Sequence, residues 1–329
     1  MKKSIAVIGG GSWGTALVKV LHENLPEVFW YMRNPEQADI IRNTGRNPRY
    51  LSFVEIDPSG VRISTDMAET VRHTDMILLA IPSAFIAGAM GKARPDFTGK
   101  ILLSAVKGLV PGHNLIMADF LQRQYRVPSE DIIIITGPSH SEEVGMERLT
   151  YLTFAGKDQS KTSEISSLFK RHYLKPVVSD DIYGTEYAAV LKNIFAIAAG
   201  IAHGLGYGDN FLAVLIANAA QEMKAFIDTV HPIDRDIKSS AYLGDLLVTA
   251  YSQFSRNRTL GTMIGKGYRV QSALLELNQV AEGYYASEGI HNILHSVPLS
   301  LPIVESVYRI LYEGISPVIE FKLLSEHLK

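Results

Sequence analysis

The sequence predicts an α/β fold with a doubly wound parallel sheet in its first half and an all-α second half. Short β-branched runs alternate with helical patterns up to about residue 180, which is typical of a parallel sheet covered by helices. Runs such as 131–135 are almost continuously apolar, as expected for strands buried on both faces. Beyond residue 180 only helical spacing continues. We therefore expect two domains, at 1–180 and 181–329.

The individual elements follow from the same patterns. Strands are expected at 4–8, 28–32, 61–64, 76–81, 100–106, 131–136, 150–155 and 175–179. Helices are expected between several of them, at 12–24, 66–72, 113–124 and 160–171, and the stretch 43–60, rich in Asn, Gly and Pro, predicts a long loop. In the second half, helices are expected at 184–203, 209–230, 239–254, 270–280, 286–296, 300–312 and 316–327.

Composition excludes several classes of function. The net charge is −2 without a long charged block, which speaks against nucleic acid or an anionic membrane surface as a partner. The chain has no cysteine, so disulfides, thiolate catalysis and cysteine-based zinc sites are excluded. The apolar stretch 194–202 is shorter than a bilayer span, and the apolar run after Lys3 is too short for a signal peptide. These observations predict a cytoplasmic protein without membrane insertion.

A glycine-rich turn directly follows the first expected strand. Gly9, Gly11 and Gly14 form the pattern G-x-G-x-x-G between an apolar run and an Ala/Leu-containing helix. In a Rossmann domain the first glycine allows the tight turn, the second lets the backbone approach a pyrophosphate, and the third lets helix and strand pack closely. The motif predicts that 1–180 binds NAD or NADP. The alternative is a glycine-rich turn that only connects two core elements.

The end of the second expected strand bears on which cofactor binds. A carboxylate there would ordinarily bind the adenosine ribose, but this strand ends in Arg33 and Asn34. An arginine can instead bind a 2′-phosphate, which favours NADP. The alternative is a surface arginine that stacks on adenine, and this would also suit NAD.

Two other expected strands end in polar residues. Lys107 follows 100–106 and precedes a glycine, so we interpret it as a functional lysine at the cleft, with a solvated surface lysine as the alternative. The segment GPSHS at 137–141 follows 131–136, and its amides and hydroxyls at a helix start would suit a polar ligand. An ordinary N-cap, with Ser139 and Glu142 as a capping box, is compatible with that interpretation.

Lys192 is the strongest catalytic candidate. It lies on the expected helix 184–203 among small and apolar residues. Since lysine is seldom buried unpaired, we expect a partner, and the carboxylate of Asp245 is available for that. As a general acid Lys192 would transfer a proton to the substrate. The alternative is a lysine whose stem is buried and whose ammonium reaches solvent.

Ser255, Arg256 and Asn257 combine a cation with short hydrogen-bonding side chains, which suits a phosphate. The alternative is a solvated helix end. No metal is expected, because a ligand spacing such as H-E-x-x-H is absent around four histidines: His113, His172, His203 and His231. A P-loop motif is also absent, which leaves a kinase function without support.

Taken in order, these segments resemble the bacterial-type NAD(P)-dependent glycerol-3-phosphate dehydrogenase family over essentially the whole chain. The matching segments are GGGSWGTAL at 9–17, NPRYL at 47–51, AVKGL at 105–109, GPSHSEE at 137–143, LKNIFAIAAGIAHGLGYGDN at 191–210, LGDLLVT at 243–249, SRNR at 255–258, GKG at 265–267 and VAEGY at 280–284. The resemblance implies a Rossmann domain at 1–180 and a helical substrate-binding and catalytic domain at 181–329.

The resemblance also implies an activity and a set of site residues. The family reversibly reduces dihydroxyacetone phosphate to sn-glycerol 3-phosphate for glycerophospholipid synthesis, with NADPH mildly favoured here over NADH. By position, Lys192 resembles the catalytic residue. Substrate contacts are implied for Lys107, Gly137, Ser139, Lys192, Asp245, Ser255, Arg256 and Asn257, and cofactor contacts for Gly9, Gly11, Ser12, Trp13, Gly14, Arg33, Lys107, Ser141, Arg256, Val280 and Glu282.

The chain departs from the family pattern at a few positions. His203 stands where an acid is common, Ala189 and Val190 replace a Gly-Ala or Gly-Thr pair, and Ser141 replaces a common alanine. These departures affect the expected shape of the pocket and the turnover. Two rival functions stay open: a related reductase of a non-phosphorylated 2-keto or 3-hydroxy acid, and a non-catalytic protein that senses NAD(P). The oligomeric state also stays open, with a homodimer as one option.

Overall fold

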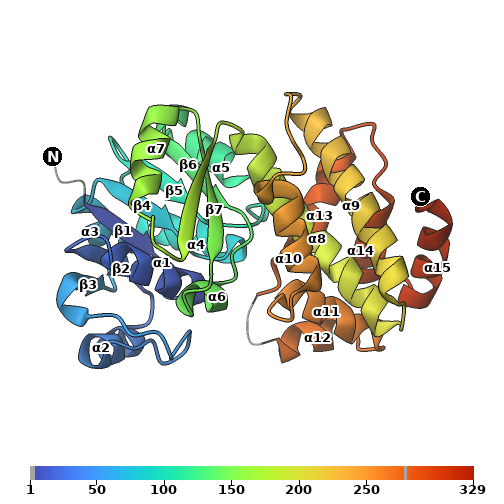
Figure 1. The fold of residues 1–329 in the computed structure, drawn as a ribbon, viewed down its shortest axis with the longest axis horizontal. Helices are drawn as coiled ribbons and strands as arrows, with labels where there is room; N and C mark the ends of the chain where they lie inside the picture. The colour runs from blue at the N-terminus through green and yellow to red at the C-terminus, as the bar shows by residue number, and fades with distance from the viewer. Residues whose placement is uncertain (1–3, 278–279) are drawn as a thin grey trace. The chain divides into compact units, whose positions relative to one another are not determined.

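The computed structural model describes residues 4–277 and 280–329, and the chain divides into two compact units (Figure 1). The first unit runs to Val106 and then from Met117 to Ile182, and the second holds Lys107–Ile116 and Tyr183–Lys329. The change at Ile182 lies two residues from the expected boundary at 180. No sequence pattern predicted that Lys107–Ile116 would join the helical unit.

The first unit is built on one eight-stranded sheet with the order β3-β2-β1-β4-β5-β6-β7-β8. Its strands are β1 (Ile5–Ile8), β2 (Val28–Tyr31), β3 (Val61–Ser64), β4 (Met76–Leu79), β5 (Ile101–Ser104), β6 (Ile132–Thr136), β7 (Thr150–Gly156) and β8 (Leu174–Ser179). All strands from β3 to β6 pair in parallel, which confirms the predicted doubly wound sheet.

One strand runs in the direction opposite to the prediction. β7 pairs with β6 antiparallel, and β8 is again parallel to β7. The connection between β6 and β7 contains only the five-residue helix α6 (Ser141–Gly145). Such a helix is about 7.5 Å long, whereas a parallel return past β6 requires about 17 Å. The chain therefore turns back, and the sheet is mostly rather than wholly parallel.

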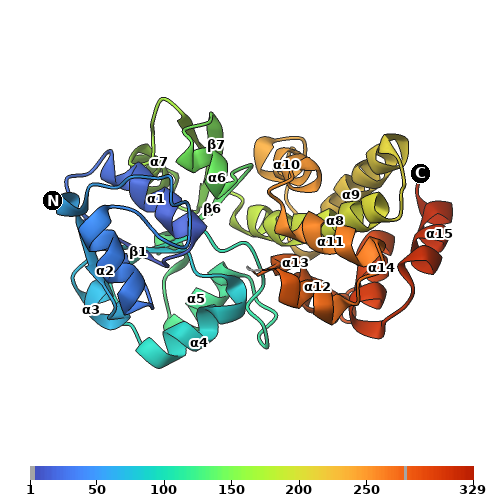
Figure 2. The same ribbon diagram turned by 90° about the horizontal axis from the view of Figure 1, so that it is seen from below.

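Helices cover both faces of this sheet. Besides α6 they are α1 (Ser12–His22), α2 (Pro35–Thr44), α3 (Met67–Arg72), α4 (Ser83–Ala93), α5 (Met117–Tyr125) and α7 (Gln159–Ser167), with short 3₁₀ turns η1 (Pro58–Gly60) and η2 (Ser129–Asp131). Figure 2 shows α1 and α7 on one side of the sheet and α4 and α5 on the other. The sequence patterns missed α2 and α4. α4 contains Gly88 and Gly91, which weaken a helical pattern.

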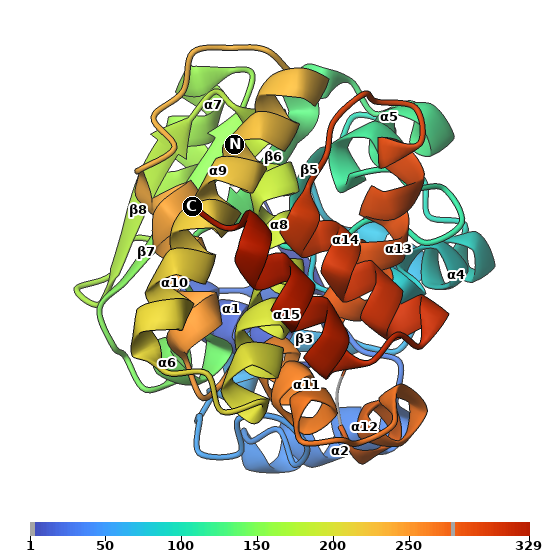
Figure 3. The same ribbon diagram turned by 90° about the vertical axis from the view of Figure 1, so that its right-hand side faces the viewer.

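The second unit is helical, as predicted. Its helices are α8 (Ile182–Gly204), α9 (Asp209–Val230), α10 (Asp245–Tyr251), α11 (Arg256–Gly265), α12 (Val270–Glu276), α13 (Glu282–Leu294), α14 (Pro302–Tyr308) and α15 (Pro317–His327), with π-helical turns η3 (Ser240–Gly244) and η4 (Arg309–Glu313). Figure 3 shows α14 between α13 and α15. α11 was not predicted. The expected helix 270–280 ends at Glu276, and its residues 278–279 lie outside the described part of the chain.

α8 is the central helix of this unit and packs tightly against α11. A Cβ added at Gly200 would lie 2.1 Å from the carbonyl oxygen of Arg258, and one at Gly261 would lie 2.1 Å from that of Ile197. Gly204 and Gly265 approach each other in the same way one turn further along. The two helices therefore touch backbone to backbone, and the start of α11 lies beside the middle of α8.

α8 is longer than the apolar stretch 194–202, which by itself is shorter than a bilayer span. The apolar stretch 194–202 is part of a 23-residue helix, which is long and apolar enough to cross a membrane by length and composition. However, 83% of its most apolar window is buried inside the protein. Its apolar surface is covered by neighbouring helices such as α11 and α13, as in the core helix of a globular unit.

Candidate active site

The glycine turn after β1 is shaped by three different constraints. Gly9 has φ +141°, and a Cβ there would lie 2.4 Å from the carbonyl oxygen of Ala80. A Cβ at Gly14 would lie 2.0 Å from the Gly9 carbonyl oxygen, so the start of α1 packs directly on the turn. By contrast, a Cβ at Gly11 would meet no described atom within 4 Å. The protein's own packing explains Gly9 and Gly14, whereas Gly11 leaves space where a ligand can approach the backbone.

Asn47 holds this turn in place, and the sequence predictions did not single it out as a site residue. Its side chain is fully buried and donates to the Gly10 carbonyl at 3.1 Å and to the Thr15 hydroxyl at 2.8 Å. Gln37 of α2 also donates to the Gly10 carbonyl, at 2.7 Å. Asn47 is therefore a positioning residue for the turn, and its signal in the sequence was the segment NPRYL at 47–51.

The N-terminus of α1 offers its first amides to an anion. Gly11 is the N-cap and has no side chain to cap the helix. Ser12 is the first helical residue and is buried, and Trp13 is half-buried beside it. Unfilled amides at a helix N-terminus, together with the helix dipole, form an anion site. This geometry fits a pyrophosphate.

Arg33 lies just beyond the end of β2 and is exposed. It makes no hydrogen bond or salt bridge to any residue in 4–277 or 280–329, so its guanidinium is available to a ligand. The following Asn34 caps α2 by accepting a hydrogen bond from the Gln37 amide at 3.1 Å. The strand end therefore presents an arginine and no carboxylate, as expected.

The segment 137–141 differs in detail from its prediction. Gly137 has φ +100°, and Ser139 donates its hydroxyl to the Gly137 carbonyl at 2.9 Å. His140, not Ser139, is the N-cap of α6, so the capping-box interpretation is wrong. Ser141 is buried, and its hydroxyl donates to Glu142 at 3.0 Å. The Ser139 hydroxyl therefore forms a hydrogen bond within the turn at Gly137.

In the helical unit, Lys192 has the partner expected for a buried lysine. Its ammonium lies 2.5 Å from a carboxylate oxygen of Asp245, and the two residues are 4% and 1% exposed. Asp245 is the first residue of α10, directly after the π-helical turn η3. Such turns are often found at functional sites. The ion pair rules out the alternative of a lysine that reaches solvent.

Lys107 is brought to the same pair by the segment Lys107–Ile116. The pKa of Lys107 is lowered to about 7, first by burial and then by the charge of Lys192, while Asp245 opposes the shift. Because the Lys107 side chain is only partly buried, we attribute its lowered pKa mainly to the positive charge of Lys192. Two lysines and one carboxylate thus form a cluster in which a proton can be exchanged near neutral pH.

A chain of side-chain amides holds this cluster together. Asn193 donates to the Lys107 carbonyl at 2.8 Å and accepts from Asn257 at 2.9 Å. Asn257 in turn accepts a hydrogen bond from the Gly283 amide at 2.9 Å. The chain therefore connects Lys107 to α8, α11 and the start of α13. Asn257, predicted as a substrate contact, is first of all a positioning residue, and Asn193 was missed.

Ser255 and Arg256 form the N-terminus of α11. Ser255 is buried and caps the helix by accepting from the Arg258 amide at 3.3 Å. Arg256 is half-buried and makes no hydrogen bond or salt bridge to the part of the chain that the structure describes. The solvated-helix-end alternative is therefore wrong for Ser255. An uncommitted arginine at a helix N-terminus suits a phosphate.

The remaining expected residues lie at the ends of helices. Val280 is half-buried and precedes α13, which begins at Glu282. Of the departures from the family pattern, His203 is exposed in the last turn of α8, while Ala189 and Val190 are buried within that helix. The cofactor contacts implied for Val280 and Glu282 stay predictions.

Comparisons with known proteins agree with this architecture. Models of the N-terminal and C-terminal parts of NAD-dependent glycerol-3-phosphate dehydrogenase match residues 4–162 and 181–321. A glycerol-3-phosphate dehydrogenase (NAD(P)+) of Bacillus pumilus is 33% identical over 95% of this chain and 91% of its own length. One from Salinibacter ruber is 35% identical over 95% and 92%. The glycerol-3-phosphate dehydrogenase structure from Coxiella burnetii has a TM-score of 0.92 at 27% identity and covers 99% of both chains.

The Rossmann-type sheet, the open glycine turn and the helical unit with its buried lysine define an NAD(P)-dependent oxidoreductase. More specifically, the chain belongs to the NAD-dependent glycerol-3-phosphate dehydrogenase family, which confirms the resemblance seen in its sequence. The roles of individual site residues stay predictions.

Proposed function

We propose that this protein reversibly reduces dihydroxyacetone phosphate to sn-glycerol 3-phosphate with NAD(P)H. The observation that carries the proposal is the buried Lys192–Asp245 ion pair with Lys107 beside it. A non-catalytic sensor of NAD(P) would not need a proton-exchanging cluster in its helical unit. The relatives named above support the same reaction.

The residues of the first unit fit a dinucleotide. The space at Gly11 and the open amides of α1 suit the pyrophosphate, and Arg33 suits a phosphate on the adenosine ribose. When bound, the nicotinamide supplies the hydride for the carbonyl carbon of the substrate. Glu282 and Val280 stay predicted cofactor contacts.

The lysine cluster performs the proton chemistry in this proposal. Lys192 donates a proton to the carbonyl oxygen as negative charge develops there, and Asp245 holds its ammonium in position. Lys107, with a pKa of about 7, holds a second proton next to the same oxygen. In the reverse direction, the same groups take the proton from the hydroxyl.

The start of α11 binds the substrate phosphate in this proposal. Arg256 supplies a planar cation, Ser255 a hydroxyl, and the first amides of the helix supply further donors. A substrate carboxylate would not need this set of donors, which argues against the rival 2-keto acid reductase. Ser139 and Gly137 stay predicted substrate contacts.

Removing Lys192 tests the proposal, but it leaves Asp245 buried without its partner and costs about 3–5 kcal/mol of stability. The informative variant is therefore Lys192→Met combined with Asp245→Leu, which removes both charges. We expect it to fold and bind NADPH while kcat falls by about 10²–10⁴-fold, the range for a lost general acid. A folded double variant with near-normal kcat would contradict the proposal.

We further propose that NADPH is the preferred cofactor, because Arg33 is exposed and unengaged at the end of β2. Parallel assays with NADPH and NADH test this, and better use of NADH would contradict it. The product would supply glycerophospholipid synthesis in the cytoplasm. A homodimer stays open and can be checked by sedimentation.

A further inference from the structure

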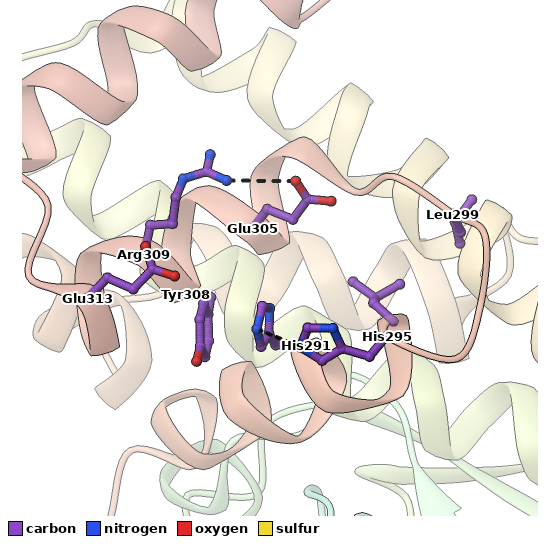
Figure 4. Close-up of a pocket in the computed structure, with 8 residues that line it drawn as sticks. His291, His295, Leu299, Glu305, Tyr308, Arg309 and Glu313 are labelled. Atoms are coloured by element: carbon purple, nitrogen blue, oxygen red, sulfur yellow. Dashed lines mark hydrogen bonds and ion pairs between the residues drawn. The ribbon is translucent and has the colours of Figure 1, made fainter.

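A cavity lies in the helical unit, lined by residues of α13, α14 and η4 (Figure 4). It has a volume of about 250 Å³ and is lined by two histidines, His291 and His295. These residues are not among those proposed for the dehydrogenase reaction. The sequence-based expectation that no metal binds rested on His113, His172, His203 and His231 and did not include these two histidines.

The two histidines converge through the same ring atom. His291 lies in the last turn of α13, and His295, four residues on, is the C-cap of that helix with helical φ and ψ, so the two share one face. Their Nε2 atoms form a hydrogen bond at 3.2 Å. Two nitrogens bound to one tetrahedral Zn²⁺, each at about 2.0–2.1 Å, lie roughly 3.4 Å from each other. The pair thus has the spacing of two ligands of one metal ion.

Neighbouring groups hold one ring in place. The ring of Tyr308 stacks on His291 with centroids 3.5 Å apart and an angle of 9° between the planes. Figure 4 shows these two rings face to face, with His295 beside them. His295 is exposed and His291 is half-buried, so the pair is accessible from solvent. The preformed arrangement reduces the entropy that a bound ion would cost.

The charges of the cavity favour a cation over an anion. Arg309 is the arginine of the cavity lining, and it forms a bidentate pair with Glu320, at 3.0 and 2.9 Å. Glu305 lies 3.7 Å from the same guanidinium, and Glu313 has no hydrogen bond or salt bridge to a described residue. Once Glu320 has balanced Arg309, Glu305 and Glu313 leave the cavity negative.

We propose that His291 and His295 form a binding site for one divalent transition-metal ion such as Zn²⁺. Within residues 4–277 and 280–329, no group of three or more ligating side chains surrounds such an ion, so water completes its coordination. Imidazole ligands select Cu²⁺, Ni²⁺ and Zn²⁺ and disfavour Mg²⁺ and Ca²⁺, with Cu²⁺ bound most tightly. The site is independent of the dehydrogenase reaction, because it uses none of that reaction's residues.

Equilibrium dialysis of the untagged protein against ZnCl₂, with MgCl₂ in a parallel experiment, tests this proposal. The variants are His291→Gln and His295→Gln, with His327→Gln as the matched control, since His327, like His295, is an exposed histidine at the C-terminal end of a helix. We expect one Zn²⁺ per wild-type and control chain and no saturable Mg²⁺. Either cavity variant should lose at least the 10–100-fold in affinity that is typical when a supporting partner of a ligand is removed.

Thermal unfolding in excess EDTA shows whether the variants keep the fold. We expect wild type and His295→Gln to unfold at similar temperatures in EDTA, with Zn²⁺ raising only the wild-type value. Zn²⁺ binding that is unchanged in both folded variants would overturn the proposal. So would a wild-type protein that binds no Zn²⁺, or one that binds Mg²⁺ equally well.

Discussion

Gly11 and Gly14 belong to one motif, but the structure separates their roles. Gly14 is required by the fold, because its Cα faces the Gly9 carbonyl at a distance that leaves no room for a side chain. Gly11 is not required by the fold, because only open space surrounds the position of its Cβ. The sequence spacing predicted the turn correctly, yet only the structure shows that Gly11, unlike Gly14, has open space beside it.

This difference predicts opposite phenotypes for two single substitutions. Gly11→Ala should leave the unfolding temperature nearly unchanged and weaken NADPH binding, since its methyl group would occupy the space for the pyrophosphate. Gly14→Ala should destabilise the protein by about 1–3 kcal/mol through overpacking. Fluorescence titration with NADPH and thermal unfolding measure the two effects. Equal NADPH affinity in wild type and Gly11→Ala would contradict the assignment of the turn.

The lowered pKa of Lys107 leads to a prediction of how the activity depends on pH. Its pKa is lowered to about 7, so it is protonated below pH 7 and neutral above. If its proton helps to stabilise the developing oxyanion, kcat/KM for ketone reduction should fall as pH rises through about 7. In the Lys107→Met variant kcat/KM should be lower at every pH, and its decrease above about pH 7 should be absent. If kcat/KM decreased at the same pH in wild type and Lys107→Met, Lys107 could not be the group responsible for the decrease.

At the scale of elements, helix ends are positioned by residues distant in sequence. Glu222 on α9 is buried and accepts hydrogen bonds from the amides of Ile303 at 2.7 Å and Val304 at 3.3 Å. It thereby caps α14, for which the local sequence around Leu301 supplies no side-chain cap. Burial, opposed by these two hydrogen bonds, raises the pKa of Glu222 to about 8.

The raised pKa of Glu222 makes stability pH-dependent. The folded state binds this proton up to about pH 8, whereas a glutamate of the unfolded chain loses it near its ordinary pKa of 4.5. The contribution of Glu222 is therefore fully present below about pH 4.5 and is lost as pH rises toward 8. Urea unfolding at pH 6 and pH 8.5 should show a larger loss for wild type than for Glu222→Gln, which keeps an acceptor without the charge. Equal losses would refute this role.

Several elements could not have been predicted from local patterns. α11 was missed because two glycines and polar residues interrupt its helical spacing, and it is stabilised by backbone contact with Gly200 on α8. The direction of β7 depends on the short reach of α6, which periodicity does not reveal. In contrast, strands such as β6 were predictable because they are buried on both faces and therefore continuously apolar.

At the scale of the whole molecule, the sequence predicted the two-part organisation and the family correctly. Lys192 was identifiable because a lysine among apolar helix residues requires a partner, and Asp245 proved to be that partner. The amide chain from Lys107 through Asn193 to Asn257 was not predictable, because its bonds join residues 86 and 64 positions apart. Long-range pairing of this kind leaves no periodic signal in a single sequence.

The central claim is that the helical unit binds a phosphorylated ketone at the start of α11. The most direct test is to follow NADPH oxidation with dihydroxyacetone phosphate and, in parallel, with dihydroxyacetone. We expect kcat/KM for the unphosphorylated ketone to be lower by at least about 10²-fold, the effect of losing two charge-assisted hydrogen bonds of about 1.5–3 kcal/mol each. Equal efficiency with both ketones would contradict the assignment of Ser255 and Arg256 to the phosphate.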